Sequence, residues 1–294
     1  MPKANINGTL LHYHVNGRGT PILFIHPPLV NRAVFRYQEV QLSDVFQVIT
    51  FDIRGHGFSP ASDIPITYPL IAEDMKGLLD YLNIKQAYVC GYSTGGGVAL
   101  EAMLAYPDRF RGAVLMGGMA KPVNWMVRGQ LGMANLMAKL GMKTSLALLV
   151  VKANADMPET FHNLYYEAIR GDIRNWQQYF EASMMYDYMD RLNRIQSPVL
   201  LVYGAKDRRF IQHGRRMYRL LPNATLAQVP GVKHCIPTHG MAALHDLATK
   251  WVMQQELRAA SAGEAHVDKN LLKKAMDYDL NIPEGLLIEN HLIR

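Results

Sequence analysis

The sequence has few of the features that mark secreted or membrane-spanning proteins. Only two cysteines, Cys90 and Cys235, occur in 294 residues, which excludes a disulfide framework and is typical of reduced thiols. The first residues show neither the basic and apolar pattern of a signal peptide nor an Arg- and Ser-rich transit pattern. No apolar run approaches the roughly 20 residues of a membrane span. We therefore expect a soluble, cytoplasmic protein.

Dense basic clusters and metal-ligand patterns are also missing. Lys and Arg number 31 against 25 Asp and Glu, which gives a formal net charge of +6, but the basic residues are spread along the chain. This distribution argues against nucleic acid as a partner. The 11 histidines are scattered, and neither cysteine has ligand spacing. The sequence therefore predicts no metal and no cofactor, and both thiols are interpreted as packed side chains.

The chain does contain short apolar runs that alternate with amphipathic stretches. Hydrophobic residues make up 49% of the sequence, enough for the core of one large α/β domain. The alternation predicts an α/β fold with a mostly parallel, doubly wound sheet. The expected strands are 9–15, 21–26, 46–52, 86–92, 112–118, 197–204 and 225–230, and the expected helices are 68–83, 94–106, 209–220 and 237–258.

Two segments depart from this rhythm. Residues 120–196 have no convincing strand, and nine of the 17 methionines fall between Met119 and Met189, which predicts a helical cap inserted before the last two expected strands. Residues 261–294 form a C-terminal extension with a polar linker, a short helix and an apolar tail. The predicted core is thus divided into 1–119 and 197–260. The extension could dock on this core, on a second copy in a homodimer or on a partner protein.

The strongest chemical signal is the sequence CGYSTGG. Gly91 to Gly95 fit the pattern G-x-S-x-G between an apolar strand and an expected helix. In this context the glycines allow a tight strand-to-helix turn that exposes Ser93 as a nucleophile, and the backbone N–H of Thr94 can stabilise an oxyanion. The alternative is a glycine-rich turn with a serine that caps the helix.

A nucleophilic serine needs a base, and the base needs an acid to orient it. Asp207 follows a buried strand, and His234 lies in the loop after the last expected core strand. The order Ser93, Asp207, His234 is the order found with this type of turn. His239 and His245 compete for the role of base, but both fall in or near the closing helix and are interpreted as structural.

These motifs resemble those of the α/β-hydrolase superfamily over residues 1 to about 258. The resemblance rests on GYSTGG, on FDIRGHGFS at 51–59, on GAKD and on GVKH. It implies the α/β-hydrolase fold with a cap over residues 120–196 and serine-dependent hydrolysis through a triad. It also implies that Asp52, Arg54 and His56 are mainly structural.

The loop after the second expected core strand departs from the family pattern. His26 matches the first residue of an H-G-x motif, whose third position usually donates a backbone N–H to the oxyanion. Here that position is Pro28, which has no N–H, and the glycine position is Pro27. Three arrangements are open. The Leu29 N–H takes over, with a cis X–Pro bond bending the loop; a side chain such as Asn31 substitutes; or only one donor exists.

The substrate pocket is expected between the sheet edge and the cap. Its methionines suit an adaptable apolar surface, although most of them are expected to pack the cap on the core. The leading prediction is a cofactor-free serine hydrolase for a small or medium apolar ester or lactone. The alternatives are a perhydrolase, a carbon–carbon bond hydrolase, or a receptor-like protein that binds a small signal ligand and recruits a partner. The expected substrate-binding residues are His26, Pro28, Leu29, Tyr92, Met119, Trp125 and Met126.

Overall fold

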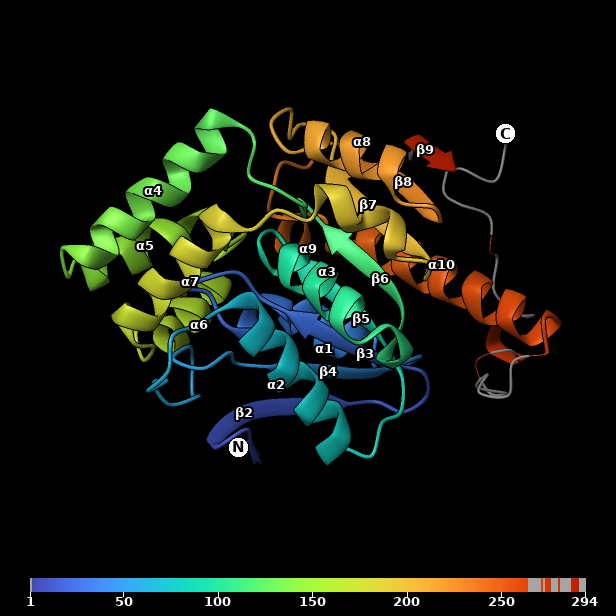
Figure 1. The fold of residues 1–294 in the computed structure, drawn as a ribbon, viewed down its shortest axis with the longest axis horizontal. Coiled ribbons are helices and arrows are strands. Elements are labelled where there is room, and N and C mark those ends of the chain that lie inside the picture. The colour runs from blue at the N-terminus through green and yellow to red at the C-terminus, as the bar shows by residue number, and fades with distance from the viewer. Residues whose placement is uncertain (1, 264–270, 272, 276–279, 281–286, 291–294) are drawn as a thin grey trace.

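A computed structural model describes residues 2–263, 271, 273–275, 280 and 287–290. Within them, nine strands form a single sheet in the order β1-β2-β4-β3-β5-β6-β7-β8-β9 (Figure 1). The pairs from β4 to β8 are parallel, whereas β1–β2, β2–β4 and β8–β9 are antiparallel. The strand bounds are β1 Lys3–Ile6, β2 Thr9–Asn16, β3 Pro21–Ile25, β4 Gln47–Phe51, β5 Ala87–Tyr92, β6 Phe110–Met116, β7 Val199–Gly204, β8 Ala224–Val229 and β9 Leu287–Asn290.

Helices cover both faces of this sheet. Alternate residues of β3 point to opposite faces, so that Leu23 packs in a core with α2 and α3 while Phe24 packs in a second core with α10. Two buried faces explain why the parallel strands read as continuous apolar runs. The core helices are α1 Arg36–Gln41, α2 Tyr68–Tyr81, α3 Gly95–Ala105, α8 Ile211–Leu220, α9 Ile236–His239 and α10 Met241–Ser261.

The fold class predicted from the sequence is confirmed. The seven expected strands correspond to β2 through β8, and the four expected helices correspond to α2, α3, α8 and α10. Strand β1, helix α1 and strand β9 were not expected. The sheet and its helices form the α/β-hydrolase fold.

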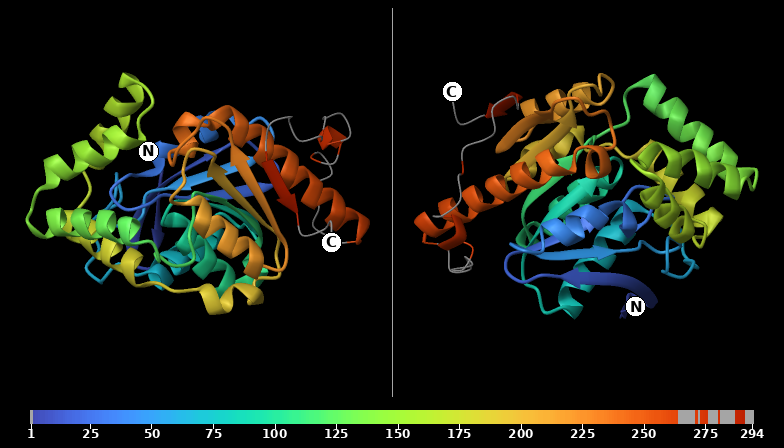
Figure 2. Two further views of the ribbon diagram at one scale, coloured as in Figure 1. Left: turned by 90° about the horizontal axis from the view of Figure 1, so that it is seen from above. Right: turned by 180° about the vertical axis from the view of Figure 1, so that it is seen from behind.

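Four helices lie between β6 and β7 and project to one side of the sheet (Figures 1 and 2). No strand occurs among residues 120–196, all of which the structure describes. The Asn124 side chain caps the first of the four helices, and the Asp172 side chain caps the last. These helices are α4 Trp125–Lys139, α5 Lys143–Asn154, α6 Pro158–Ala168 and α7 Ile173–Met185.

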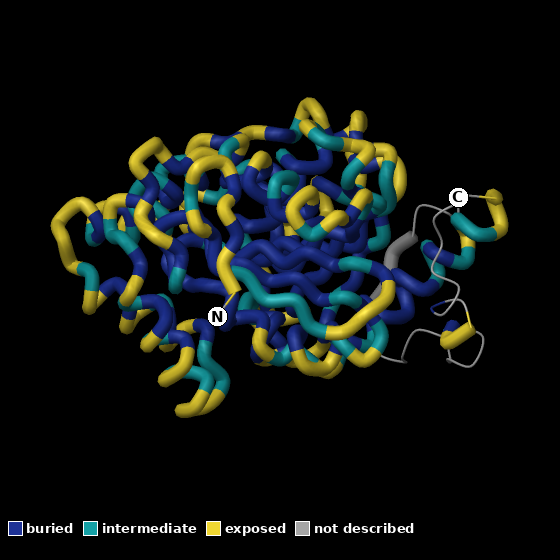
Figure 3. The backbone as a smooth tube through the Cα atoms, turned by 90° about the horizontal axis from the view of Figure 1, so that it is seen from below, coloured by how far each residue is buried: buried dark blue, intermediate teal, exposed yellow. Residues whose placement is uncertain are grey.

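The C-terminal extension returns to the sheet. Strand β9 pairs antiparallel with β8, with Ala227 opposite Ile288. The polar linker and most of the short helix expected in this extension lie outside the described residues. Residues in the centre of the sheet are buried, whereas many residues at the periphery of the molecule are exposed (Figure 3). No helix in the described part of the chain is long and apolar enough to cross a lipid bilayer.

Candidate active site

Ser93 lies on a strained turn between β5 and α3. Its φ of 54° is in the left-handed region, and its N–H donates to the Met116 carbonyl at 2.8 Å. A Cβ on Gly91 would lie 2.7 Å from the Gly95 carbonyl oxygen, and a Cβ on Gly95 would lie 2.5 Å from the Ile25 carbonyl oxygen. The two glycines of the motif are therefore required by close backbone contacts.

Three side chains that are far apart in the sequence form one hydrogen-bonded chain. The His234 Nε2 atom lies 2.9 Å from the Ser93 hydroxyl oxygen, and the His234 Nδ1 atom lies 2.8 Å from Asp207 Oδ2. Ser93 and His234 are partly exposed, whereas Asp207 is buried. This geometry lets His234 accept the serine proton while Asp207 holds the imidazole in place.

Two aromatic rings and a glycine hold the imidazole of His234. The Phe210 ring centroid lies 3.8 Å from that of His234, and the Tyr92 centroid lies 5.6 Å from it. A Cβ on Gly117 would come within 2.8 Å of His234 Cε1. Phe210 was not expected from the sequence, although its position three residues after Asp207 in the same loop is a signal that could have indicated it.

The two backbone N–H groups considered as oxyanion donors are without acceptors. Within the described residues, neither the Thr94 N–H nor the Leu29 N–H donates a hydrogen bond to the protein. Thr94 precedes the first turn of α3, where the helix dipole favours negative charge. Leu29 has a φ of 72°, a conformation that is uncommon for a non-glycine residue and often found at functional sites.

We call the loop with Pro27 and Pro28 the proline loop. The structure agrees with neither of two arrangements considered for it, a cis X–Pro bond and a donor from Asn31. Within the described residues every peptide bond is trans, so the expected cis X–Pro bond is wrong and the loop bends at Leu29 instead. The Asn31 side chain is buried and occupied, since its Oδ1 accepts from the Ala33 N–H and its Nδ2 donates to the Leu164 carbonyl. Asn31 therefore caps a short helix from a fully buried position, where both ends of its amide are bonded to the protein.

His26 fixes this loop from inside the protein. The Ile53 N–H donates to His26 Nε2 at 3.0 Å, so Nδ1 carries the proton and donates to the Pro27 carbonyl at 2.9 Å. Burial lowers the pKa of His26, which keeps the ring neutral. Tyr179 of the cap helix α7 donates to the His26 carbonyl at 3.0 Å. The ring is fully buried, so His26 positions the loop and does not meet the expectation of a substrate contact.

The remaining residues expected to bind substrate are not gathered on one surface. Pro28 and Leu29 are buried in the loop, and Met119 is buried in the core with its carbonyl bonded to the Tyr186 hydroxyl. Trp125 and Met126 are exposed on α4, and both line a surface hollow beside α8. Of the expected set, Tyr92 lies against the His234 ring, and its hydroxyl donates to Asn154 Oδ1 of α5 at 2.9 Å.

The residues of the FDIRGHGFS motif bond to other parts of the protein. The Asp52 carboxylate accepts from His12 Nδ1 at 2.7 Å, from the Arg32 N–H at 2.9 Å and from the Phe58 N–H at 3.0 Å. Arg54 forms a buried ion pair with Asp74 at 2.6 Å. These contacts agree with a structural role for the motif.

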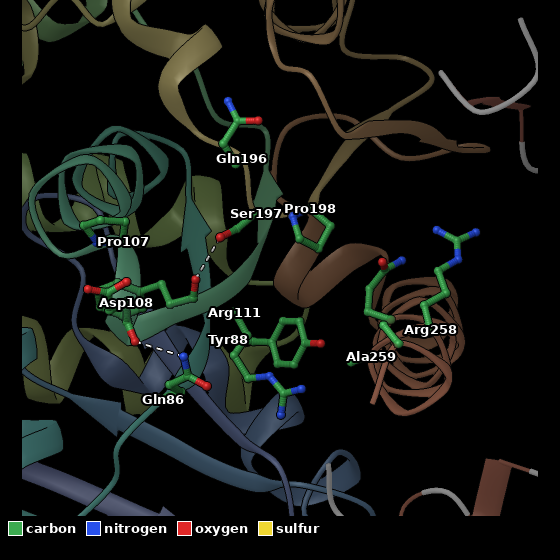
Figure 4. Close-up of a pocket in the computed structure, with 13 residues that line it drawn as sticks. Gln86, Tyr88, Pro107, Asp108, Arg111, Gln196, Ser197, Pro198, Arg258 and Ala259 are labelled. Carbon is green, nitrogen blue, oxygen red and sulfur yellow. Dashed lines mark hydrogen bonds between the residues drawn. The ribbon is translucent and has the colours of Figure 1, made fainter. Parts of the chain in front are cut away.

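A second hollow lies at the opposite end of the strands (Figure 4). Its volume is about 520 Å³, and it is lined by residues that precede β5, β6 and β7, among them Gln86, Asp108 and Ser197. Two of its lining residues bond to the buried Glu256: the Tyr88 hydroxyl donates to it at 2.8 Å, and Arg111 pairs with it at 3.0 Å. Because the triad lies at the carboxyl ends of the strands, this polar hollow is separate from it.

The two cysteines are free and do not pair with each other. Cys90 is buried in β5, and the Cys235 thiol donates to the Ala153 carbonyl of the cap at 2.8 Å. Burial raises the pKa of both thiols, which disfavours reactive thiolates. No cluster of three metal-ligating side chains occurs in the part of the chain that the structure describes.

A known protein family matches most of the chain. Residues 20–238 match the sequence profile of the alpha/beta hydrolase fold family. The chain belongs to the α/β-hydrolase family. The membership expected from GYSTGG, FDIRGHGFS, GAKD and GVKH is thereby confirmed.

Relatives within the α/β-hydrolase family are similar to most of the chain. A 3-oxoadipate enol-lactonase of Acinetobacter baylyi is 28% identical over 218 residues, which cover 70% of this chain and 82% of the relative. The enol-lactonase structure from Burkholderia xenovorans superposes with a TM-score of 0.76 at 23% identity, over 85% of this chain and 99% of that one. An esterase from Thermogutta terrifontis has a TM-score of 0.76 at 20% identity, over 86% and 98%. These two structures share the α/β-hydrolase fold with this chain.

Proposed function

We propose that this protein is a cofactor-free serine hydrolase that cleaves a small or medium apolar ester or lactone through an acyl-enzyme. The observation that supports it most strongly is the hydrogen-bonded chain from Ser93 through His234 to Asp207, with Ser93 on the strained turn. The enol-lactonase and esterase names among the relatives and structural neighbours favour the same class of substrate.

In the first half of the reaction, the Ser93 oxygen attacks the carbonyl carbon while His234 Nε2 takes the serine proton. The imidazolium that forms is stabilised by the Asp207 carboxylate. The tetrahedral intermediate then expels the alkoxide leaving group, to which His234 returns the proton. With a lactone, the alcohol formed stays attached to the acyl chain.

In the second half, water attacks the acyl-enzyme with His234 again acting as base, and the acid is released with Ser93 restored. The negative charge on the carbonyl oxygen needs donors in both halves. The N–H groups of Thr94 and Leu29 are proposed as these donors, because both are without acceptors and the loop that carries Leu29 packs on the start of α3. His26 and Tyr179 are positioning residues that hold this loop.

Substitution of the nucleophile tests the proposal. Ser93→Ala should lower the turnover of short-chain aryl esters and lactones by at least about 10⁴-fold, because the remaining groups cannot form the acyl-enzyme. Turnover is measured spectrophotometrically, and labelling by a fluorophosphonate probe is followed by mass spectrometry. Ser197→Ala is the matched control, because Ser197 lies in the polar hollow at the opposite end of the strands.

The labelling result distinguishes the enzyme from a receptor-like protein. We expect rapid turnover and covalent labelling of Ser93 in the wild type. Labelling with negligible turnover of every ester and lactone tried would favour the receptor-like alternative. If Ser93 is not labelled at all, the triad itself is contradicted.

The proline loop is tested by Pro28→Ala, which restores an N–H at the position that donates in most of the family. We expect kcat to fall about three- to tenfold, because a freer loop holds Leu29 less firmly in its strained conformation. Pro27→Ala, at the more exposed neighbouring proline, is the control. A clear rise in kcat in Pro28→Ala would instead show that the restored N–H is a better donor than Leu29.

A further inference from the structure

One side of α4 exposes large apolar side chains along the length of the helix. Exposure is 78% for Trp125, 57% for Met133, 48% for Leu136 and 67% for Leu140, which directly follows the last turn. Intervals of eight, three and four residues place the four on one side, whereas Val127, Asn135 and Ala138 are buried on the other. We call Trp125, Met133, Leu136 and Leu140 the α4 stripe. A continuous row of this kind marks an interaction surface.

The chain around the α4 stripe is cationic. No Asp or Glu occurs between Asp108 and Asp156. The cations of α4, α5 and the segment before them are Lys121, Arg128, Lys139, Lys143 and Lys152.

Only some of this positive charge is neutralised. Lys121 pairs with Asp187 at 2.6 Å, and Lys139 pairs with Glu181 at 3.0 Å. Within the described residues, Arg128 and Lys152 form no ion pair, and both are exposed. The apolar row is therefore bordered by uncompensated positive charge.

The Trp125 end of the stripe adds two further cations. Trp125 and Met126 share a hollow of about 450 Å³ with Arg209 and Arg216 of the α8 region. Neither arginine has an ion pair in the described part of the chain, and both are exposed. An indole and two guanidinium groups thus face the same space, as in proteins that lie on a membrane surface.

We propose that the α4 stripe and its flanking arginines form a docking surface for an anionic lipid bilayer. The four apolar side chains would enter the boundary between headgroups and acyl chains, and Arg128, Arg209 and Arg216 would meet the anionic headgroups. Charge favours this occupant over a second copy of the chain. A two-fold interface would set the same uncompensated cations against each other, whereas an anionic bilayer offers the opposite charge.

The position of this surface relative to the rest of the molecule suits such docking. Helix α4 projects from the cap, on the side away from β9 and the C-terminal end of α10 (Figures 1 and 2). Phe210, which stacks on His234, lies next to Arg209 in the chain. A docked protein would thus hold the loop that carries Asp207 and Phe210 near the bilayer, where apolar substrates accumulate.

Intrinsic fluorescence reports on docking directly. Of the three tryptophans, Trp125 is exposed, whereas Trp176 and Trp251 are buried at 0% and 5% exposure. The full chain is titrated with vesicles of phosphatidylcholine alone and of phosphatidylcholine mixed equally with phosphatidylglycerol, and binding is confirmed by co-sedimentation. We expect a blue shift and sedimentation with the mixed vesicles, both strongly reduced with neutral vesicles and at high salt.

Two variants separate the apolar and the charged contributions. Leu136→Gln with Leu140→Gln should weaken binding at least tenfold, because the polar side chains no longer enter the apolar layer. Arg209→Gln with Arg216→Gln should weaken binding to mixed vesicles by about fivefold for each charge removed. Leu220→Gln, at an apolar residue of α8 that is 41% exposed, is the control and should bind as the wild type does.

The outcomes also separate docking from the proposed hydrolase activity. Vesicle binding is measured on Ser93→Ala as well, and turnover of a water-soluble ester is measured on the leucine variant, in which it should be unchanged. Binding without any ester turnover would contradict the hydrolase and leave docking intact. Equal binding to both vesicle types, no binding, or unchanged binding of the leucine variant would overturn the docking surface. A dimer in analytical ultracentrifugation that the leucine variant abolishes would assign the stripe to a second copy and overturn it too.

Discussion

The loop that carries Asp52 and the outer side of α4 differ in which groups they bury. The loop buries a charged side chain, whereas α4 leaves apolar side chains exposed to solvent. Asp52 is a fully buried carboxylate with three hydrogen-bond donors around it, whereas Leu140 is an apolar side chain left 67% exposed. A buried charge is stable only while its partners are present, but an exposed leucine contributes little to folding. The buried Asp52 carboxylate therefore matters for the stability of the fold. The α4 stripe contributes little to that stability and is available to contact another surface. Substitutions on the two sides should differ accordingly.

The largest effect on stability is expected for Asp52→Ala. It leaves the His12 ring and the N–H groups of Arg32 and Phe58 without their acceptor inside the protein. We expect the free energy of unfolding to fall by about 3–5 kcal/mol in urea denaturation. Asp63→Ala removes an exposed carboxylate from the same region and should change it by less than about 0.5 kcal/mol. Equal effects of the two substitutions would contradict the structural role of Asp52.

An intermediate effect that depends on pH is expected where the cap meets the core. Glu167 of α6 is buried 3.6 Å from Arg32, and burial raises its pKa to about 7 although the Arg32 charge acts in the opposite direction. The unfolded chain releases this proton near pH 4.3. Between these values the folded state holds more protons, so stability falls as pH rises from about 4.3 to 7 and is level above that.

Glu167→Gln tests this sign. The stability of the variant should not decline across that interval. The difference in the free energy of unfolding between the variant and the wild type should therefore shift in favour of the variant by up to about 3 kcal/mol from pH 4 to pH 8. Denaturant unfolding at a series of pH values measures it. Glu159→Gln, at an exposed position of the same helix, should follow the wild-type curve. A Glu167→Gln variant that is less stable at pH 8 would show that the pairing with Arg32 outweighs the cost of burial.

The smallest effect is expected for Leu140→Gln in the α4 stripe. The side chain gives up little buried surface, so the free energy of unfolding should change by less than about 0.5 kcal/mol in urea. Leu146→Gln, at a fully buried position of the next helix, should cost several times more. A large loss of stability in Leu140→Gln would show that the stripe belongs to the folded core after all.

The parallel strands could be predicted because burial on both faces leaves apolar runs in the sequence. Strand β1 has only four residues and packs two of them, Ala4 and Ile6, so its pattern is too short to be distinctive. Strand β9 pairs through its backbone with β8, and such pairing at the edge of a sheet depends on register more than on composition. Helix α1 has six residues, which are too few to show a helical period in the sequence.

The candidate triad could be predicted for a similar reason. Ser93, Asp207 and His234 each follow a strand, and the carboxyl ends of parallel strands meet at one edge of the sheet. The conformation of the proline loop could not be predicted in the same way. Whether Leu29 has a positive φ, and whether the His26 ring points inward to Pro27 and Ile53, are decided by contacts between segments far apart in the chain. The burial of Met119 could not be predicted either, because sequence position does not tell the direction of a side chain.

The pairing of β9 with β8 has a consequence for how copies of the protein behave toward each other. Both outermost strands of the sheet, β1 and β9, are four residues long and antiparallel to their neighbours. Without β9, the six-residue parallel strand β8 would present open N–H and C=O groups to any extended chain. Strand β9 covers this edge of β8 and thereby disfavours edge-to-edge aggregation. Its backbone pairing with β8 thus bears on the solubility of the protein independently of the chemistry that the triad performs.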